Sequence, residues 1–189
     1  LFMITIAPFL IQTSLERVIS ALRIVSAEKP AYASGIPLFS YAFPLYRGLI
    51  FIGGIALLLL ARPIYRGEEW TYPVALLASA FPSAGGMFMF MPYVSFVDGF
   101  PVPMAVSIAG LIFFWSFILL RNVDKWVKWG QFLALTFAGM LTTHAFIVGI
   151  GNLRTLMTRP DKPMYSGLGT WVLAWSQPIQ WICVILLFI

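Results

Sequence analysis

The segment Tyr72–Val97, YPVALLASAFPSAGGMFMFMPYVSFV, is the strongest indication of the fold of this chain, because it is long, apolar and free of charge. A helix that crosses a bilayer needs about 20 apolar residues, and this stretch is long enough. Its centre nevertheless reads FPSAGG, and proline and glycine both disfavour a helix interior. In lipid, the backbone groups freed by such a break must be satisfied by neighbouring helices, side chains or water. We therefore expect a helix that is interrupted at Pro82, Ser83, Gly85 and Gly86 and lies inside a helical assembly.

The composition is that of a membrane protein. Of the 189 residues, 60% are hydrophobic and only 10% are charged, whereas soluble domains carry about 25% charged residues. The net charge of +5 does not indicate nucleic-acid binding, because the basic residues are spread among the ends of apolar runs. At those positions Lys and Arg anchor helices and meet anionic lipid headgroups. The expected partners are membrane lipids and other transmembrane subunits, and nucleic acid is not among them.

Further apolar runs predict an all-α, multi-pass integral membrane protein with five to six transmembrane helices. The additional spans are expected at Gly48–Ala61, Pro103–Leu120, Gln131–Leu153 and Gly169–Ile189, with Leu1–Gln12 as a short sixth candidate. Asp98-Gly99 is a turn signal, so the interrupted segment and the span after it should form an antiparallel hairpin. We expect one transmembrane domain over residues 1–189, with an interfacial helix and connector at 13–46 and a helical bundle at 48–189.

The region before the bundle suggests a helix at the membrane surface. Thr13–Ser26 places an apolar stripe on one face of a helix, and Thr13 and Ser14 could provide its N-cap. Such an amphipathic helix could lie along the membrane or pack against a partner subunit. The prolines of Lys29–Tyr46 argue against a regular helix there, and Arg121–Trp129 is expected to be a basic loop.

The termini, the single cysteine and the basic residues give little information about the fold or the orientation. Leu1 is not methionine and Ile189 falls within an apolar run, so we expect an incomplete or processed form of a longer chain. Cys183 is the only cysteine, which rules out an internal disulfide. The Lys and Arg residues divide seven to five between the two sides, whether residues 72–97 form one kinked span or a re-entrant pair of half-helices. The positive-inside rule therefore does not select an orientation.

His144 is the only histidine and lies near the middle of an expected span. An ionisable side chain inside the membrane suggests a functional role, because burying it costs free energy. His144 could bind a haem or pigment, donate a hydrogen bond to a quinone, or carry a proton. A neutral imidazole bonded to a neighbouring helix is the structural alternative.

Two further groups of residues are candidate contacts. Gln177 and Trp175 lie in the last span, where an amide could bond another helix or line a quinone or lipid site. Met87, Met89 and Met91 could suggest a Cu(I) pathway. Without a nearby cysteine or histidine, core packing is the better interpretation of these methionines.

The sequence lacks the residues that several classes of membrane protein require. No charged residue is expected deep in any span, which argues against proton pumps and ion-coupled carriers. The sequence also lacks the common hydrolase and nucleotide-binding motifs, and we identify no catalytic residue. The first hypothesis is a structural or cofactor- and lipid-contacting subunit of a larger energy-converting, electron-transfer or transport complex. The alternatives are a small transporter or channel for a neutral or hydrophobic solute at Pro82–Gly86, and a membrane enzyme using His144.

Overall fold

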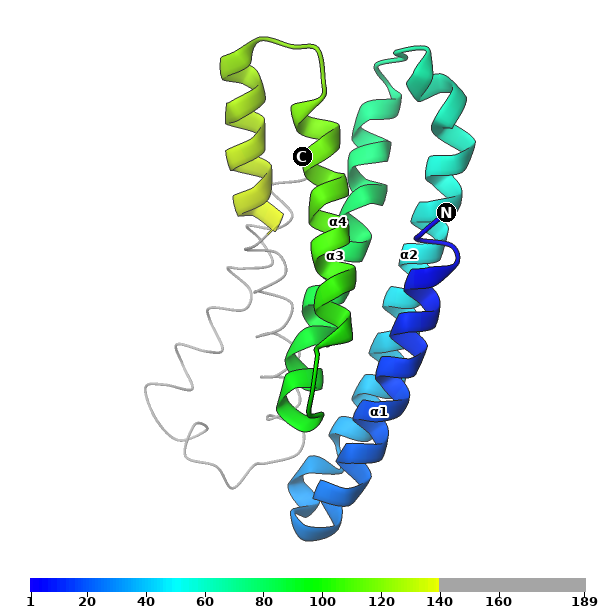
Figure 1. The fold of residues 1–189 in the computed structure, drawn as a ribbon, viewed down its shortest axis with the longest axis vertical. Coiled ribbons are helices and arrows are strands. Elements are labelled where there is room, and N and C mark those ends of the chain that lie inside the picture. The colour runs from blue at the N-terminus through cyan, green and yellow to red at the C-terminus, as the bar shows by residue number, and fades with distance from the viewer. Residues whose placement is uncertain (140–189) are drawn as a thin grey trace. The chain divides into compact units, whose positions relative to one another are not determined.

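The computed structural model describes residues 1–139, and every regular element within them is helical. The elements are α1 (Ile6–Glu28), the 3-10 turn η1 (Pro30–Tyr32), α2 (Gly35–Tyr65), α3 (Thr71–Phe96) and α4 (Val102–Leu119) (Figure 1). Residues 125–139 form a further helical stretch. The chain divides into two compact units, Leu1–Phe132 and Leu133–Ile189, and the architecture described below is that of the first. The prediction of an all-helical chain is confirmed for the described residues.

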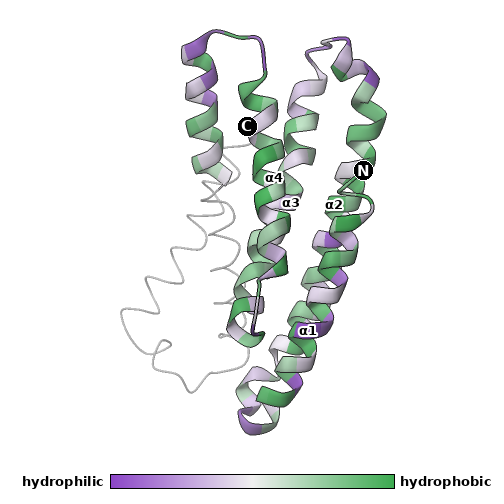
Figure 2. Cartoon of the chain, in the orientation of Figure 1, coloured by the Kyte–Doolittle hydropathy of each residue, from purple (hydrophilic) through white to green (hydrophobic). Residues whose placement is uncertain are grey.

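Three segments of the described chain are long and apolar enough to cross a membrane. They are Pro30–Tyr65, Thr71–Phe96 and Val102–Leu119. Figure 2 shows that α2, α3 and α4 are mainly hydrophobic, while hydrophilic residues are frequent on α1 and at the turns. The span predicted at 48–61 lies within the first segment, and those predicted at 72–97 and 103–120 match the other two to within one residue at each end. Most of the span predicted at Gln131–Leu153, and all of that at Gly169–Ile189, lie outside the described residues.

Helices α1 and α2 form an antiparallel pair (Figure 1). Leu22 lies near Gly35 at one end of the pair, and Met3 and Ile4 lie near Gly54 at the other. The buried face of α1 consists of residues at helical spacing, namely Ala7, Ile11, Ser14, Val18 and Leu22. The predicted start of this amphipathic helix at Thr13 is therefore wrong. The helix begins seven residues earlier, at Ile6, because the apolar run before Thr13 continues the stripe that packs against α2.

Helix α2 corrects the predicted irregular connector over Lys29–Tyr46. It begins at Gly35 and continues for 31 residues, with Pro44 and Pro63 inside it. Pro37 is harmless because the N–H groups of the first turn have no partner within a helix. Pro44 does remove one internal hydrogen bond, but the adjacent Phe43 is completely buried. Packing of this kind outweighs the local preference against proline.

Helices α3 and α4 form the predicted antiparallel hairpin. The chain turns between them at Asp98-Gly99, where Gly99 has a φ of +100° that favours glycine. The predicted interruption of α3 is wrong, because a single helix covers Thr71–Phe96 and includes both Pro82 and Pro92. A re-entrant pair of half-helices is likewise not what the structure contains. The reason is tight packing against α2 and α4, which is described with the site below.

The loop after α4 is shorter than predicted. The carboxylate of Asp124 accepts a hydrogen bond of 2.8 Å from the backbone N–H of Trp126. This is an N-cap contact, and a helical stretch begins at residue 125. The prediction of a loop over Arg121–Trp129 is therefore wrong from residue 125 onward.

Candidate functional site

The predicted site at Pro82–Gly86 is a contact surface for α4. A Cβ atom added to Gly86 would lie 2.5 Å from the backbone nitrogen of Ser107. One added to Gly110 of α4 would lie 2.8 Å from the carbonyl carbon of Pro82. Between these contacts, the Ser107 hydroxyl donates a 3.0 Å hydrogen bond to the backbone carbonyl of Ser83. The two backbones are therefore in direct contact, as small residues permit in membrane helices.

The other side of the same segment packs against α2. Because Pro82 has no N–H, the carbonyl of Ala78 loses its usual partner within the helix. A Cβ atom on Gly53 of α2 would lie 3.0 Å from that carbonyl oxygen, so the freed group faces the α2 backbone. Gly85 lies similarly close to the side chain of Tyr46. The predicted role of Gly53-Gly54, close approach by another helix, is confirmed.

A layer of polar side chains joins α1, α2 and α3 near the end of α3. Arg17 of α1 donates a 3.1 Å hydrogen bond to the hydroxyl of Tyr93, whose side chain is completely buried. We call Gln12, Glu16, Arg17, Arg47 and Tyr93 the polar layer.

Tyr72 and Tyr93 are 21 residues apart on α3, a rise of about 32 Å. This separation is close to the thickness of a bilayer's hydrocarbon core, about 30 Å.

Within the polar layer, one amide connects two opposite charges. Arg47 of α2 donates a hydrogen bond to the side-chain oxygen of Gln12, and the Gln12 amide donates to the Glu16 carboxylate at 2.9 Å. Arg47 was predicted to stand just before the span at 48–61, and it lies inside α2 and within the apolar segment Pro30–Tyr65.

A groove beside the polar layer has charged residues on both walls. It has a volume of about 510 Å³. Glu16, Arg17 and Ser20 of α1 form one wall, and Phe96, Val97 and Asp98 at the end of α3 form the other. We call it the α1–α3 groove. Glu16, Ser20 and Asp98 are exposed, so the groove opens to the surface.

Sequence reasoning missed both the polar layer and the α1–α3 groove. One signal was present: Gln12 and Glu16 are four residues apart, which places them on the same face of a helix. The contacts of Arg17 with Tyr93 and of Arg47 with Gln12 join residues 76 and 35 positions apart. No local pattern in the sequence predicts such pairs.

The remaining predicted site residues lie either outside the described residues or on α3. His144, Gln177 and Trp175 lie outside the described residues, as do Cys183 and Arg154. Met89 is completely buried, in keeping with the packing interpretation, whereas Met87 and Met91 are about half exposed. Within residues 1–139, no three His, Cys, Asp or Glu side chains come close enough together to bind a metal ion.

The described residues thus define a class of protein, a helical chain with three segments able to cross a membrane and a charged groove at one end of a helical hairpin. No protein-family model, curated protein or solved structure matches the sequence.

Proposed function

We propose that the chain is a multi-pass transmembrane subunit of a larger membrane complex of the energy-converting, electron-transfer or transport type. Its role is mainly structural, in contact with lipid or a hydrophobic cofactor. This function needs helices that pack firmly against one another and still present an apolar surface to a neighbour. Helix α4 has both properties, and it carries the proposal.

The inner face of α4 packs mainly against α3. Its buried residues are Pro103, Val106, Ser107, Gly110 and Ile118. The glycine contacts at Gly86 and Gly110 leave no room for a solute between the two backbones. The sequence at Pro82–Gly86 is thus accounted for by packing, and a solute pathway there would require α3 and α4 to separate.

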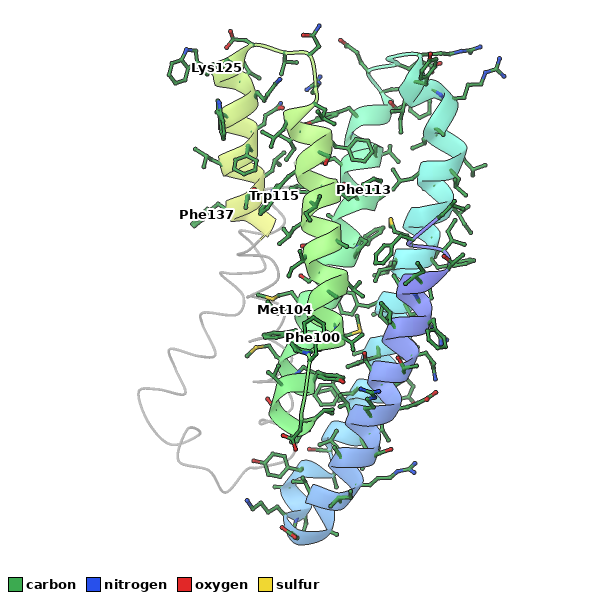
Figure 3. The ribbon with its side chains drawn as sticks, in the orientation of Figure 1. Phe100, Met104, Phe113, Trp115, Lys125 and Phe137 are labelled. Carbon is green, nitrogen blue, oxygen red and sulfur yellow. The ribbon has the colours of Figure 1, made fainter. Side chains whose placement is uncertain are left out.

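The opposite face of α4 carries an apolar stripe. Its members recur every four residues, and each is 41–69% exposed: Phe100 just before the helix, then Met104, Ile108 and Ile112. Figure 3 labels Phe100 and Met104 at the beginning of this stripe. A contiguous apolar surface of this kind marks contact with lipid or with another protein. We assign it to a helix of a partner subunit.

Photocrosslinking in native membranes tests this assignment. Benzoylphenylalanine at Ile108 should yield a discrete, larger adduct that contains a second protein. The matched control is benzoylphenylalanine at Leu59 of α2, which is also apolar and is 76% exposed; it should not give that adduct. The same adduct from both positions would indicate random collision. That result, or recovery of a lone chain from mild detergent, would contradict the proposal.

A further inference from the structure

The α1–α3 groove combines charges of both signs at the end of a membrane-length helix. Asp98 lies two residues beyond the end of α3, and the bilayer interface is the region where phospholipid headgroups lie. We propose that this groove binds the headgroup of a zwitterionic phospholipid, which carries a phosphate and an ammonium group. The inference rests on the membrane placement proposed above, but not on the existence of partner subunits.

Arg17 is suited to the phosphate. A guanidinium has five N–H donors in a planar fork, and the described contact with Tyr93 engages one of the two terminal nitrogens. That contact also restrains the side chain, so less conformational entropy is lost when a ligand binds. Arginine binds phosphate oxygens with two parallel hydrogen bonds, which favours this pairing over a single point contact.

Asp98 is suited to the ammonium group. It lies in the opposite wall of the groove from Arg17, and its carboxylate has no hydrogen-bond or ion-pair partner among residues 1–139. The second carboxylate, Glu16, already accepts a hydrogen bond from Gln12, which is bonded in turn to Arg47. One cation and one free carboxylate therefore remain for a ligand that carries one charge of each sign.

The rest of the groove favours a lipid over a small polar solute. Ala21, Phe96 and Val97 provide apolar walls beside the charged groups. These side chains can contact the glycerol backbone and the first methylenes of an acyl chain, whose burial is favourable. An anionic lipid that lacks the ammonium group would place its charge near Asp98 without a compensating partner.

Native mass spectrometry of the purified full chain tests this site. After delipidation, phosphatidylethanolamine and phosphatidylglycerol are added separately, and the retained lipid is measured. Wild type should retain phosphatidylethanolamine about tenfold better, the ratio that corresponds to one charge-assisted contact. Arg17→Gln should lower the retention of both lipids, because both carry the phosphate, and Asp98→Asn should remove most of the preference. Arg23→Gln, an exposed position of α1 outside the groove, should leave it unchanged.

Asp98→Asn keeps the test decisive if Arg17→Gln perturbs the fold through Tyr93. Equal retention of the two lipids by wild type, or an unchanged preference in Asp98→Asn, would overturn the proposal. Glycerophosphoethanolamine, which carries the same headgroup without acyl chains, should compete poorly. Competition as effective as that of the lipid would assign the groove to a soluble ligand instead. Because the chain is measured alone, a missing partner subunit would not affect these outcomes.

Discussion

The guanidinium of Arg17 donates a hydrogen bond to the hydroxyl of Tyr93 and thereby joins α1 to the last turn of α3. Arg17 is exposed, while Tyr93 is buried among the helices. The contact therefore links the surface of the hairpin to its interior. It also holds one wall of the α1–α3 groove against α3.

Replacing Tyr93 with phenylalanine should lower stability by about 1 kcal/mol, because a hydrogen bond is lost while the ring stays packed. The melting temperature in detergent should fall by about 2–4 °C. Tyr41→Phe is the control, because Tyr41 is 80% exposed and should give no shift. Equal shifts in the two variants would show that the Arg17 contact contributes nothing.

Replacing Gly86 with alanine should destabilise the hairpin, because the new methyl group would overlap the backbone of Ser107. Overpacking of this kind costs about 1–3 kcal/mol. Gly48→Ala is the matched control, since Gly48 is also inside a helix but has no atom within 4 Å of an added Cβ. There, alanine should be neutral or stabilising. Thermal unfolding of both variants in detergent would be compared, and tolerance of Gly86→Ala would refute the close contact.

Asp124→Ala should weaken the start of the helical stretch that begins at residue 125. Loss of an N-cap costs about 1 kcal/mol, so the first turn should open more often. Hydrogen exchange at the backbone N–H of Trp126, which bonds the Asp124 carboxylate, should become about fivefold faster. Asp124→Ser, which preserves a capping oxygen, should exchange at close to the wild-type rate. An unchanged rate in Asp124→Ala would mean that the cap does not hold this turn.

The described topology also predicts an orientation. The end of the hairpins formed by the α2–α3 turn and the α4 terminus carries five basic residues, Arg62, Arg66, Arg121, Lys125 and Lys128; the opposite end carries two, Arg23 and Lys29. Arg17 and Arg47 are not included in these numbers, because each is hydrogen-bonded within the polar layer. Counted over residues 1–139 alone, this bias leads us to expect the five-residue end in the cytoplasm.

Cysteine labelling checks this orientation in a background where Cys183 is replaced by serine. A membrane-impermeant reagent added to intact cells should label Asp98→Cys and spare Lys125→Cys. The reverse pattern would contradict the orientation. Labelling of both positions only after permeabilisation would also contradict it.

Local sequence patterns predicted the elements well where packing and pattern agree. The apolar run at Pro103–Leu120 and the turn at Asp98-Gly99 each appear as predicted. Errors arose at prolines and polar residues inside helices, because tertiary contacts outweigh local preferences at those positions. Pro44 and Pro82 lie inside continuous helices, and Thr13 lies inside α1 rather than capping it.

The candidate site was less predictable than the fold. The contact of Arg17 with Tyr93 depends on how α1 pairs with α2 and how α3 then packs on both. Pairings between distant segments leave no periodic signal in the chain. The small residues were more informative: Gly53-Gly54 predicted close helix packing without identifying the partner helix.

The reciprocal contacts of Gly86 with Ser107 and of Gly110 with Pro82 also limit how the molecule can move. If α3 slid by one helical turn along α4, Phe90 or Pro82, each four residues from Gly86, would replace that glycine against the α4 backbone. Spin labels at the exposed positions Val94 and Met104 should therefore give one narrow distance distribution, and a broad one would indicate sliding. Any conformational change of this protein would then move α3 and α4 together as one rigid unit.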